Sequence, residues 1–155
     1  MRWWLILTAW LLAAANAQDP AIRALVSELA AARTPAGRDA LLARDPKLVT
    51  PELARALIDR GEEQRLKGDY APSLEAYSLA QSVAERAGDR FLVARALYGT
   101  GMLRYLQSDF EQALELHRKG LAIREALGDR AGIAAVLNQI GVLYHNLGEF
   151  ELSLE

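Results

Sequence analysis

The residues able to do acid–base or metal chemistry are few and scattered. The only histidines are His117 and His145, neither has a second histidine three or four residues away, and the chain has no cysteine, so zinc-type ligand spacing is absent. No Gly-x-Ser-x-Gly elbow or glycine-rich phosphate loop is present. The acidic pair Glu62-Glu63 falls on an amphipathic stretch, where a solvated face is the ordinary explanation. We therefore expect no enzyme active site, no metal and no cofactor within these residues.

Composition narrows the class of partner. The chain has 155 residues, enough for one domain with a real core, and a formal net charge of −2 with 25% charged residues. A near-neutral balance without a basic run gives no electrostatic reason to expect nucleic acid as a partner. The absence of cysteine excludes disulfides and thiolate metal sites, and it carries no information about the compartment.

The elements that would position any site recur along the chain at a spacing of 40 residues. Self-similarity at a fixed period marks a repeat architecture in which each unit packs against its neighbours. Glycine, leucine and aromatic residues and two Gly-Asp-Arg turns share this register: Gly61/Gly101/Gly141, Leu57/Leu97/Leu137, Tyr70/Phe110/Phe150, Leu74/Leu114/Leu154, and residues 88–90 and 128–130.

Start and stop signals divide the repeated part into pairs of helices. Thr50-Pro51 is a typical helix start, and Gly88 followed by Asp89 ends one helix and caps the next. With turns also near residues 67–69, 108–109 and 148–149, the sequence predicts repeats over residues 50–88, 89–128 and 129–155. The third repeat is truncated, because its second helix has only residues 150–155.

The segment before the repeats, residues 18–49, lacks the 40-residue register. Asp19-Pro20 begins an apolar stripe that predicts a helix from about residue 20 to 32. Thr34-Pro35 begins a second, shorter helix to about residue 44, which the Asp45-Pro46 pair interrupts. Because an end repeat has no neighbour on one side, we expect these helices to cap the first repeat.

The first 17 residues have the three-part form of a secretory signal peptide. Arg2 supplies a positive charge, residues 3–15 form an uncharged and mostly apolar run, and residues 15–17 form an Ala-x-Ala cleavage pattern. The run is shorter than the roughly 20 apolar residues of a membrane-spanning helix. We expect cleavage after Ala17 and export to the periplasm or the medium, with no membrane span in the mature chain. The alternatives are an uncleaved N-terminal anchor and a buried helix.

The repeated stretch resembles the tetratricopeptide repeat family over about residues 50–155. In the third repeat the family's first-helix pattern is matched by Leu137, Ile140-Gly141 and Tyr144, and its second-helix pattern is matched in the second repeat by Phe110 and Ala113. Tyr77 and His117 occupy a place that the family usually fills with an aromatic residue, so His117 is expected to be a core residue. The resemblance implies an all-α fold, a right-handed α-solenoid of antiparallel helix hairpins.

The sequence also departs from the family pattern. The usual period is about 34 residues, whereas this one is 40. The usual proline after the second helix is absent, and a longer helix ending in Glu-Arg-Ala-Gly-Asp-Arg or Glu-Ala-Leu-Gly-Asp-Arg replaces it. These features resemble a longer-helix subtype that is common in bacterial regulatory proteins and in cargo or peptide adaptors.

The resemblance also implies where a ligand would bind, because the first helices of the repeats line a concave groove. Tyr98, Met102 and Tyr105 would form an adaptable aromatic patch, with Tyr105 equally compatible with the core. Arg55, Arg65 and Arg95 could hold a carboxylate, or be solvated. The candidate groove residues are Arg55, Arg65, Arg95, Tyr98, Met102, Tyr105, Asn138, Val142 and His145.

Three functional interpretations follow from this reading. The first is a scaffold of an exported bacterial protein that binds a protein or peptide segment in its groove without a cofactor. The second is the N-terminal sensing or docking region of a larger signalling or protease-like protein, with the catalytic module beyond residue 155. The third is self-association through the open third repeat, whose first helix lacks most of its partner.

Overall fold

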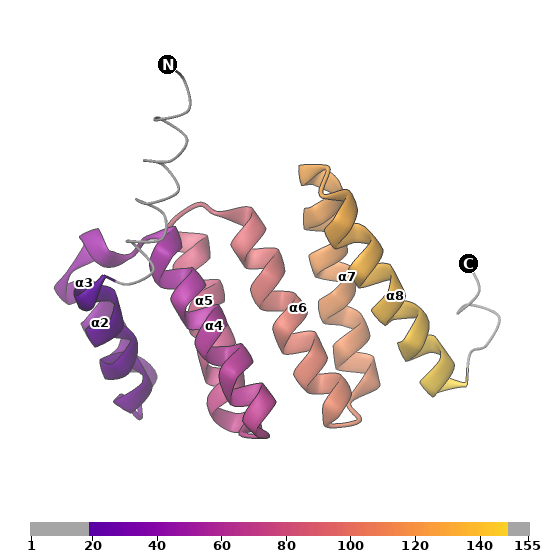
Figure 1. Cartoon of the computed structure of the whole chain (residues 1–155), viewed down its shortest axis with the longest axis horizontal. Helices are drawn as coiled ribbons and strands as arrows, with labels where there is room; N and C mark the ends of the chain where they lie inside the picture. Colours follow the sequence, from indigo (N-terminus) through magenta and orange to yellow (C-terminus); the bar gives the residue numbers. More distant parts are fainter. Residues whose placement is uncertain (1–18, 149–155) are drawn as a thin grey trace, which may run out of the picture.

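A computed structural model describes residues 19–148 as a row of antiparallel helices that follow one another in chain order (Figure 1). Within this part the chain is all-α, and neighbouring helices pack in the manner of a helical solenoid, as predicted. The predicted signal peptide and the predicted helix at residues 150–155 lie outside the described residues. The elements are α2 (Pro20–Ala31), α3 (Pro35–Arg44), the 3-10 turn η1 (Pro46–Leu48), α4 (Pro51–Lys67), α5 (Tyr70–Arg86), α6 (Arg90–Leu106), α7 (Phe110–Leu127) and α8 (Arg130–Leu147).

The predicted start and stop signals form caps of the expected kind. The Thr50 and Asp89 side chains accept hydrogen bonds from the backbone N–H of Leu53 at 3.3 Å and of Leu92 at 3.0 Å, and thus satisfy otherwise unpaired groups at the first turn. The predicted Gly88 turn has a φ of +72°, a conformation that costs glycine little. The 3-10 turn η1 was not predicted; it follows Asp45, whose side chain accepts from Lys47 N–H.

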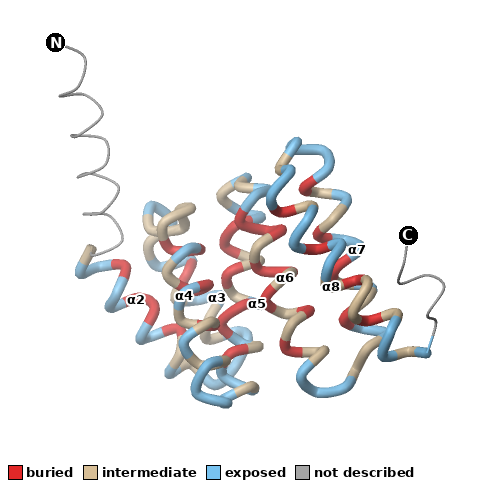
Figure 2. The backbone as a smooth tube through the Cα atoms, turned by 45° about the vertical axis from the view of Figure 1, so that its right-hand side comes forward, coloured by how far each residue is buried: buried red, intermediate tan, exposed pale blue. Residues whose placement is uncertain are grey.

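The core runs along the stack between adjacent helices, where the buried residues concentrate (Figure 2). Leu57 and Leu97 are 1% and 5% exposed, whereas Leu137, their counterpart in α8, is 50% exposed among the described residues. Each fully buried leucine contributes roughly 1.5–3 kcal/mol to folding. On α7 the core is less complete, because Leu114, Leu121 and Ile123 are only half-buried.

Two glycines inside α6, Gly99 and Gly101, are packing sites. A Cβ at Gly101 would lie 2.7 Å from the His117 ring, and a Cβ at Gly99 would lie 2.4 Å from the Tyr77 ring. Helix α6 can therefore lie this close to α5 and to α7 only because these positions lack a side chain. Gly120 differs from them, because a Cβ there would meet its nearest neighbour, the Ala94 carbonyl oxygen, at an ordinary 3.7 Å.

The N-terminal helices contact the first repeat in different ways. Helix α2 packs on α4 and α5 through buried residues such as Leu25 and Leu29. Helix α3 is joined to α5 by two ion pairs, Arg38–Glu75 at 2.7 Å and Arg86–Asp39 at 2.9 Å. The contact of α2 is thus apolar, whereas α3 combines these ion pairs with the buried Leu42.

Candidate binding site between the repeats

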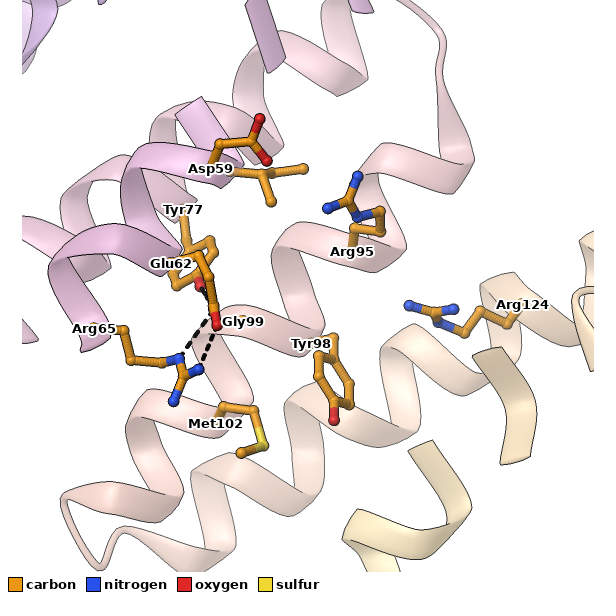
Figure 3. A pocket seen from close by; sticks show the side chains of 10 residues that line it. Asp59, Glu62, Arg65, Tyr77, Arg95, Tyr98, Gly99, Met102 and Arg124 are labelled. Atoms are coloured by element: carbon orange, nitrogen blue, oxygen red, sulfur yellow. Dashed lines mark hydrogen bonds and ion pairs between the residues drawn. The ribbon is translucent and has the colours of Figure 1, made fainter. Parts of the chain in front are cut away.

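A cavity of about 570 Å³ lies between the first helices of two successive repeats, α4 and α6 (Figure 3). We call it the inter-repeat pocket. Helices α5 and α7 each add one residue to its lining. The lining residues are Ile58, Asp59, Glu62 and Arg65 from α4, Tyr77 from α5, Arg95, Tyr98, Gly99 and Met102 from α6, and Arg124 from α7.

The repeat register explains why these side chains meet. Ile58 and Tyr98 hold the same position in successive repeats, and so do Glu62 and Met102. Helices α4 and α6 have the same orientation and contact each other directly. Equivalent positions of the two repeats therefore lie side by side along one face. The pocket is therefore built from repeated positions that carry different side chains.

One wall of the pocket is a hydrogen-bonded cluster around Glu62. The Tyr77 hydroxyl donates to Glu62 Oε2 at 2.8 Å, and Arg65 Nε donates to the same oxygen at 3.0 Å. Arg65 Nη2 also pairs with Glu62 Oε1. The hydrogen bond from Arg65 holds the pKa of the Glu62 carboxyl below its ordinary value, although burial opposes this shift. Glu62 was expected on a solvated face; its side chain keeps partial exposure and is in addition hydrogen-bonded to Arg65 and Tyr77.

Tyr77 connects this wall to the core. Its side chain is only 2% exposed, and burial, assisted by the Glu62 hydrogen bond, raises the pKa of its hydroxyl. Its ring lies against both Gly61 and Gly99, where an added Cβ would come within 2.9 Å and 2.4 Å of ring atoms. Tyr77 can therefore reach from α5 between α4 and α6 because Gly99 leaves that space open.

The three arginines of the lining differ in their partners. Arg65 is paired with Glu62, and Arg124 Nη1 pairs with Asp129 Oδ2 at 2.6 Å beside the Phe91 ring. Arg95 has no hydrogen-bond or ion-pair partner among residues 19–148, and its guanidinium is directed into the space between α4 and α6 (Figure 3). It is half-buried. The pocket thus contains one arginine whose charge no described side chain neutralises by direct contact.

The structure brings four of the predicted groove residues together in this pocket: Arg65, Arg95, Tyr98 and Met102. Arg55 is outside the lining, exposed on α4 with the Glu52 carboxylate 3.7 Å away. Tyr105 is also outside it, and its ring contacts the Phe110 ring with centroids 5.8 Å apart.

The remaining predicted residues, Asn138, Val142 and His145, lie together on α8. With Leu137 and Gly141 they line a second, more open hollow of about 330 Å³, which we call the α8 hollow. It is formed by α8 alone within the described residues, and its positions correspond to the face of α4 that includes Ile58 and Glu62. The predicted groove residues are therefore divided between two places.

Sequence reasoning did not select Asp59, Gly99 or Arg124 as site residues. Asp59 and Gly99 share a register position one residue after Ile58 and Tyr98, which is a signal available from the repeat alone. Arg124 belongs to a second helix, and the sequence does not show that its long side chain reaches the groove face. Tyr77 was recognised only as an aromatic position of the family pattern, and its hydroxyl in addition reaches Glu62.

His117 occupies the core position predicted for it. It is 1% exposed, its ring lies 5.4 Å from the Tyr98 ring, and neither ring nitrogen has a hydrogen-bond partner within residues 19–148. Burial lowers the pKa of His117 to about 4. A neutral buried imidazole in this position supports the back of Tyr98.

Two features are absent from residues 19–148. No group of three or more His, Cys, Asp or Glu side chains there is arranged to hold a metal ion. None of the helices in that range combines the length and hydrophobicity that crossing a membrane requires.

Comparison with known proteins gives one family match. The family model described as tetratricopeptide repeat matches residues 52–126 and, in a second overlapping match, residues 92–155. The two matches cover all three repeats that the register predicts. A search of curated proteins returns no significant match.

Proposed function

The chain belongs to the tetratricopeptide repeat family, and we propose that it binds a peptide segment of a partner protein in the inter-repeat pocket. Repeats of this family generally mediate protein–protein interactions and are typically non-catalytic scaffolds. The binding step needs neither a cofactor nor a covalent intermediate. The groove is the part of the fold that neighbouring repeats build jointly, which suits an extended ligand.

The observation that carries the proposal is the composition of the pocket lining. Ile58, Tyr98 and Met102 offer an apolar and adaptable surface beside the fixed Glu62–Arg65–Tyr77 cluster. Binding sites commonly combine apolar contact area with a few well-positioned polar groups. Tyrosine, methionine and arginine are also enriched in protein interfaces.

Selection from a random-peptide display library on the 155-residue chain, followed by fluorescence anisotropy, tests this function directly. Tyr98→Ala and Met102→Ala should each weaken a selected peptide by about tenfold or more, because both remove contact area at the centre of the pocket. Val142→Ala, a similar truncation in the α8 hollow, is the matched control and should leave the affinity unchanged. Equal losses at Val142 and Tyr98, or no selected peptide, would contradict the proposal.

We further propose that the protein is exported and belongs to a bacterial subtype with 40-residue repeats. The support is the basic start at Arg2, the apolar run 3–15 and the Ala-x-Ala pattern at 15–17, together with the longer second helices. Intact mass measurement of exported protein should give an N-terminus at Gln18. An N-terminus at Met1 would contradict cleavage.

Self-association through α8 stays a prediction. Its basis is the 50% exposure of Leu137, whose counterparts in α4 and α6 are buried. Light scattering should show a concentration-dependent increase in mass that Leu137→Glu reduces. A constant monomer mass at all concentrations would exclude it.

A further inference from the structure

The charges in the inter-repeat pocket do not cancel in pairs. Two of its three arginines are committed, Arg65 to Glu62 and Arg124 to Asp129. Arg95 retains five N–H donors without a partner within residues 19–148. A half-buried guanidinium gains from a charged acceptor, because partial removal of water strengthens the interaction.

The acidic groups of the pocket lining do not supply Arg95 with a hydrogen-bonded acceptor. The Glu62 carboxylate is hydrogen-bonded to Arg65 and Tyr77, and Arg95 acts on it only through space, without a hydrogen bond or ion pair. Asp59 is exposed, and no ion pair joins it to Arg95. Figure 3 shows Asp59 on α4 and Arg95 on α6 with no dashed line joining them.

We propose that Arg95 binds a single carboxylate side chain, aspartate or glutamate, of the peptide held in the inter-repeat pocket. The apolar residue next to that acid lies on Tyr98 and Met102. This inference rests on the proposed function, and it adds the chemistry of the ligand. The planar guanidinium matches a carboxylate in a two-hydrogen-bond geometry.

The same lining argues for a carboxylate over a phosphate dianion. Glu62, Arg65 and Arg124 are already paired, so Asp59 and Arg95 are the lining residues whose charges have no ion-pair partner in the described part of the chain. A second negative charge on the ligand would find no second unpaired arginine in the lining and would be repelled by Asp59. A singly charged acid is therefore the better match.

The repeat register limits this recognition to one place. The position of Arg95 is held by Arg55 in α4 and by Ala135 in α8. Arg55 lies outside the pocket with Glu52 beside it, and an alanine cannot bind an anion. One acidic residue of the peptide should therefore dominate the electrostatic part of binding.

The test uses a peptide selected by display on the 155-residue chain. Each Asp or Glu of the peptide is replaced in turn by Asn or Gln, and affinity is measured by fluorescence anisotropy against wild type, Arg95→Gln, Arg95→Lys and the control Arg55→Gln. One acid-to-amide change should cost about tenfold with wild type and Arg55→Gln and nothing further with Arg95→Gln. Arg95→Lys should give an intermediate loss, since it keeps the charge without the planar fork.

The outcomes separate the inference from the function. If peptides bind and Tyr98→Ala weakens them, while no acid-to-amide change couples to Arg95, the inference is overturned and the proposed function stands. If no peptide is selected, the function itself fails. A phosphoserine in place of the key acid should bind more weakly, and tighter binding would overturn the assignment to a carboxylate. Thermal melts of the Arg95 variants confirm that each is folded.

Discussion

The first and second repeats use the same helix position in different ways. Tyr77 and His117 occupy equal places, and each lies over a glycine of its own repeat, Gly61 or Gly101. The Tyr77 hydroxyl continues to Glu62 in the pocket, whereas both nitrogens of His117 are without partners in the described part. One repeat position thus joins core and site in the first repeat and serves packing alone in the second.

The residues of the following first helix that correspond to these two rings also differ between the repeats. The next first helix carries Gly99 against Tyr77, and at the equivalent position after His117 it carries Gln139. A glycine leaves room for the larger ring, and the smaller imidazole does not require one. Variation at paired positions, within a constant backbone, is therefore what makes the α4–α6 pocket distinct.

The largest predicted difference between the two positions is their response to acid. Because burial lowers the pKa of His117 from about 6.5 to about 4, the unfolded chain binds a proton that the folded chain resists between these values. The stability that comes from keeping His117 neutral is therefore complete above pH 6.5. As the pH drops to 4, the free energy of unfolding falls by about 3 kcal/mol.

Urea denaturation at a series of pH values measures this effect. His117→Phe should remove most of the slope between pH 6.5 and about 4.5, a window chosen because carboxylates such as Glu62 titrate mainly below it. Tyr77→Phe should retain the slope. A wild-type stability that stays constant across this window would show that His117 is not the buried neutral group described above.

The next effect concerns Gly99. Gly99→Ala places a Cβ 2.4 Å from the Tyr77 ring, so Tyr77 must move, and overpacking should destabilise the fold by about 2 kcal/mol. Gly120→Ala is the control, since its Cβ would lie an ordinary 3.7 Å from the nearest atom, the Ala94 carbonyl oxygen, and alanine favours a helix. Equal stability of the two variants in thermal melts would mean that Tyr77 does not depend on Gly99.

A smaller effect is expected from the tyrosine hydroxyl alone. Tyr77→Phe removes the 2.8 Å hydrogen bond to Glu62 and should cost about 1 kcal/mol, because Arg65 still pairs with the carboxylate. NMR titration should show the pKa of Glu62 rising in this variant, since a hydrogen bond that lowers it is lost. An unchanged Glu62 pKa would remove Tyr77 from the cluster.

The smallest effect lies in the turns. Ser108 has a φ of +61° at the position where the other repeats have Gly68 and Gly148, with φ of +82° and +79°. Ser108→Gly should stabilise the protein by about 0.5–1 kcal/mol, because serine is strained in the left-handed region. Gly68→Ser should do the opposite by a similar amount. Denaturation midpoints that move in the same direction would contradict this account.

Much of the fold follows from local signals in the sequence. Thr50-Pro51, Gly88-Asp89 and the other caps define the helix ends, and the 40-residue register identifies which faces are buried. Leu137 shares the register of Leu57 and Leu97 but is exposed, because burial of that face depends on a neighbouring helix rather than on α8 itself; this is the open face expected for the truncated third repeat. The domain boundaries at residues 17 and 49 stay predictions.

The site was less predictable than the fold. The family resemblance implied that Arg95, Tyr98 and Met102 lie on the groove face, and all three line the inter-repeat pocket. It could not show that Tyr105 packs on Phe110, or that Arg124 reaches the pocket from α7, because these depend on side-chain reach between helices. The sequence also could not show which arginines form ion pairs. The ion pair with Glu62 is what distinguishes Arg65 from Arg95.

The most direct test of the central claim is amide chemical-shift mapping of the ¹⁵N-labelled chain with the tightest display-selected peptide. The account predicts that the largest shifts fall on residues 58–65 of α4 and 95–102 of α6, and that Arg95→Gln reduces them. Largest shifts on residues 137–145 of α8, with α4 and α6 unchanged, would contradict binding in the inter-repeat pocket.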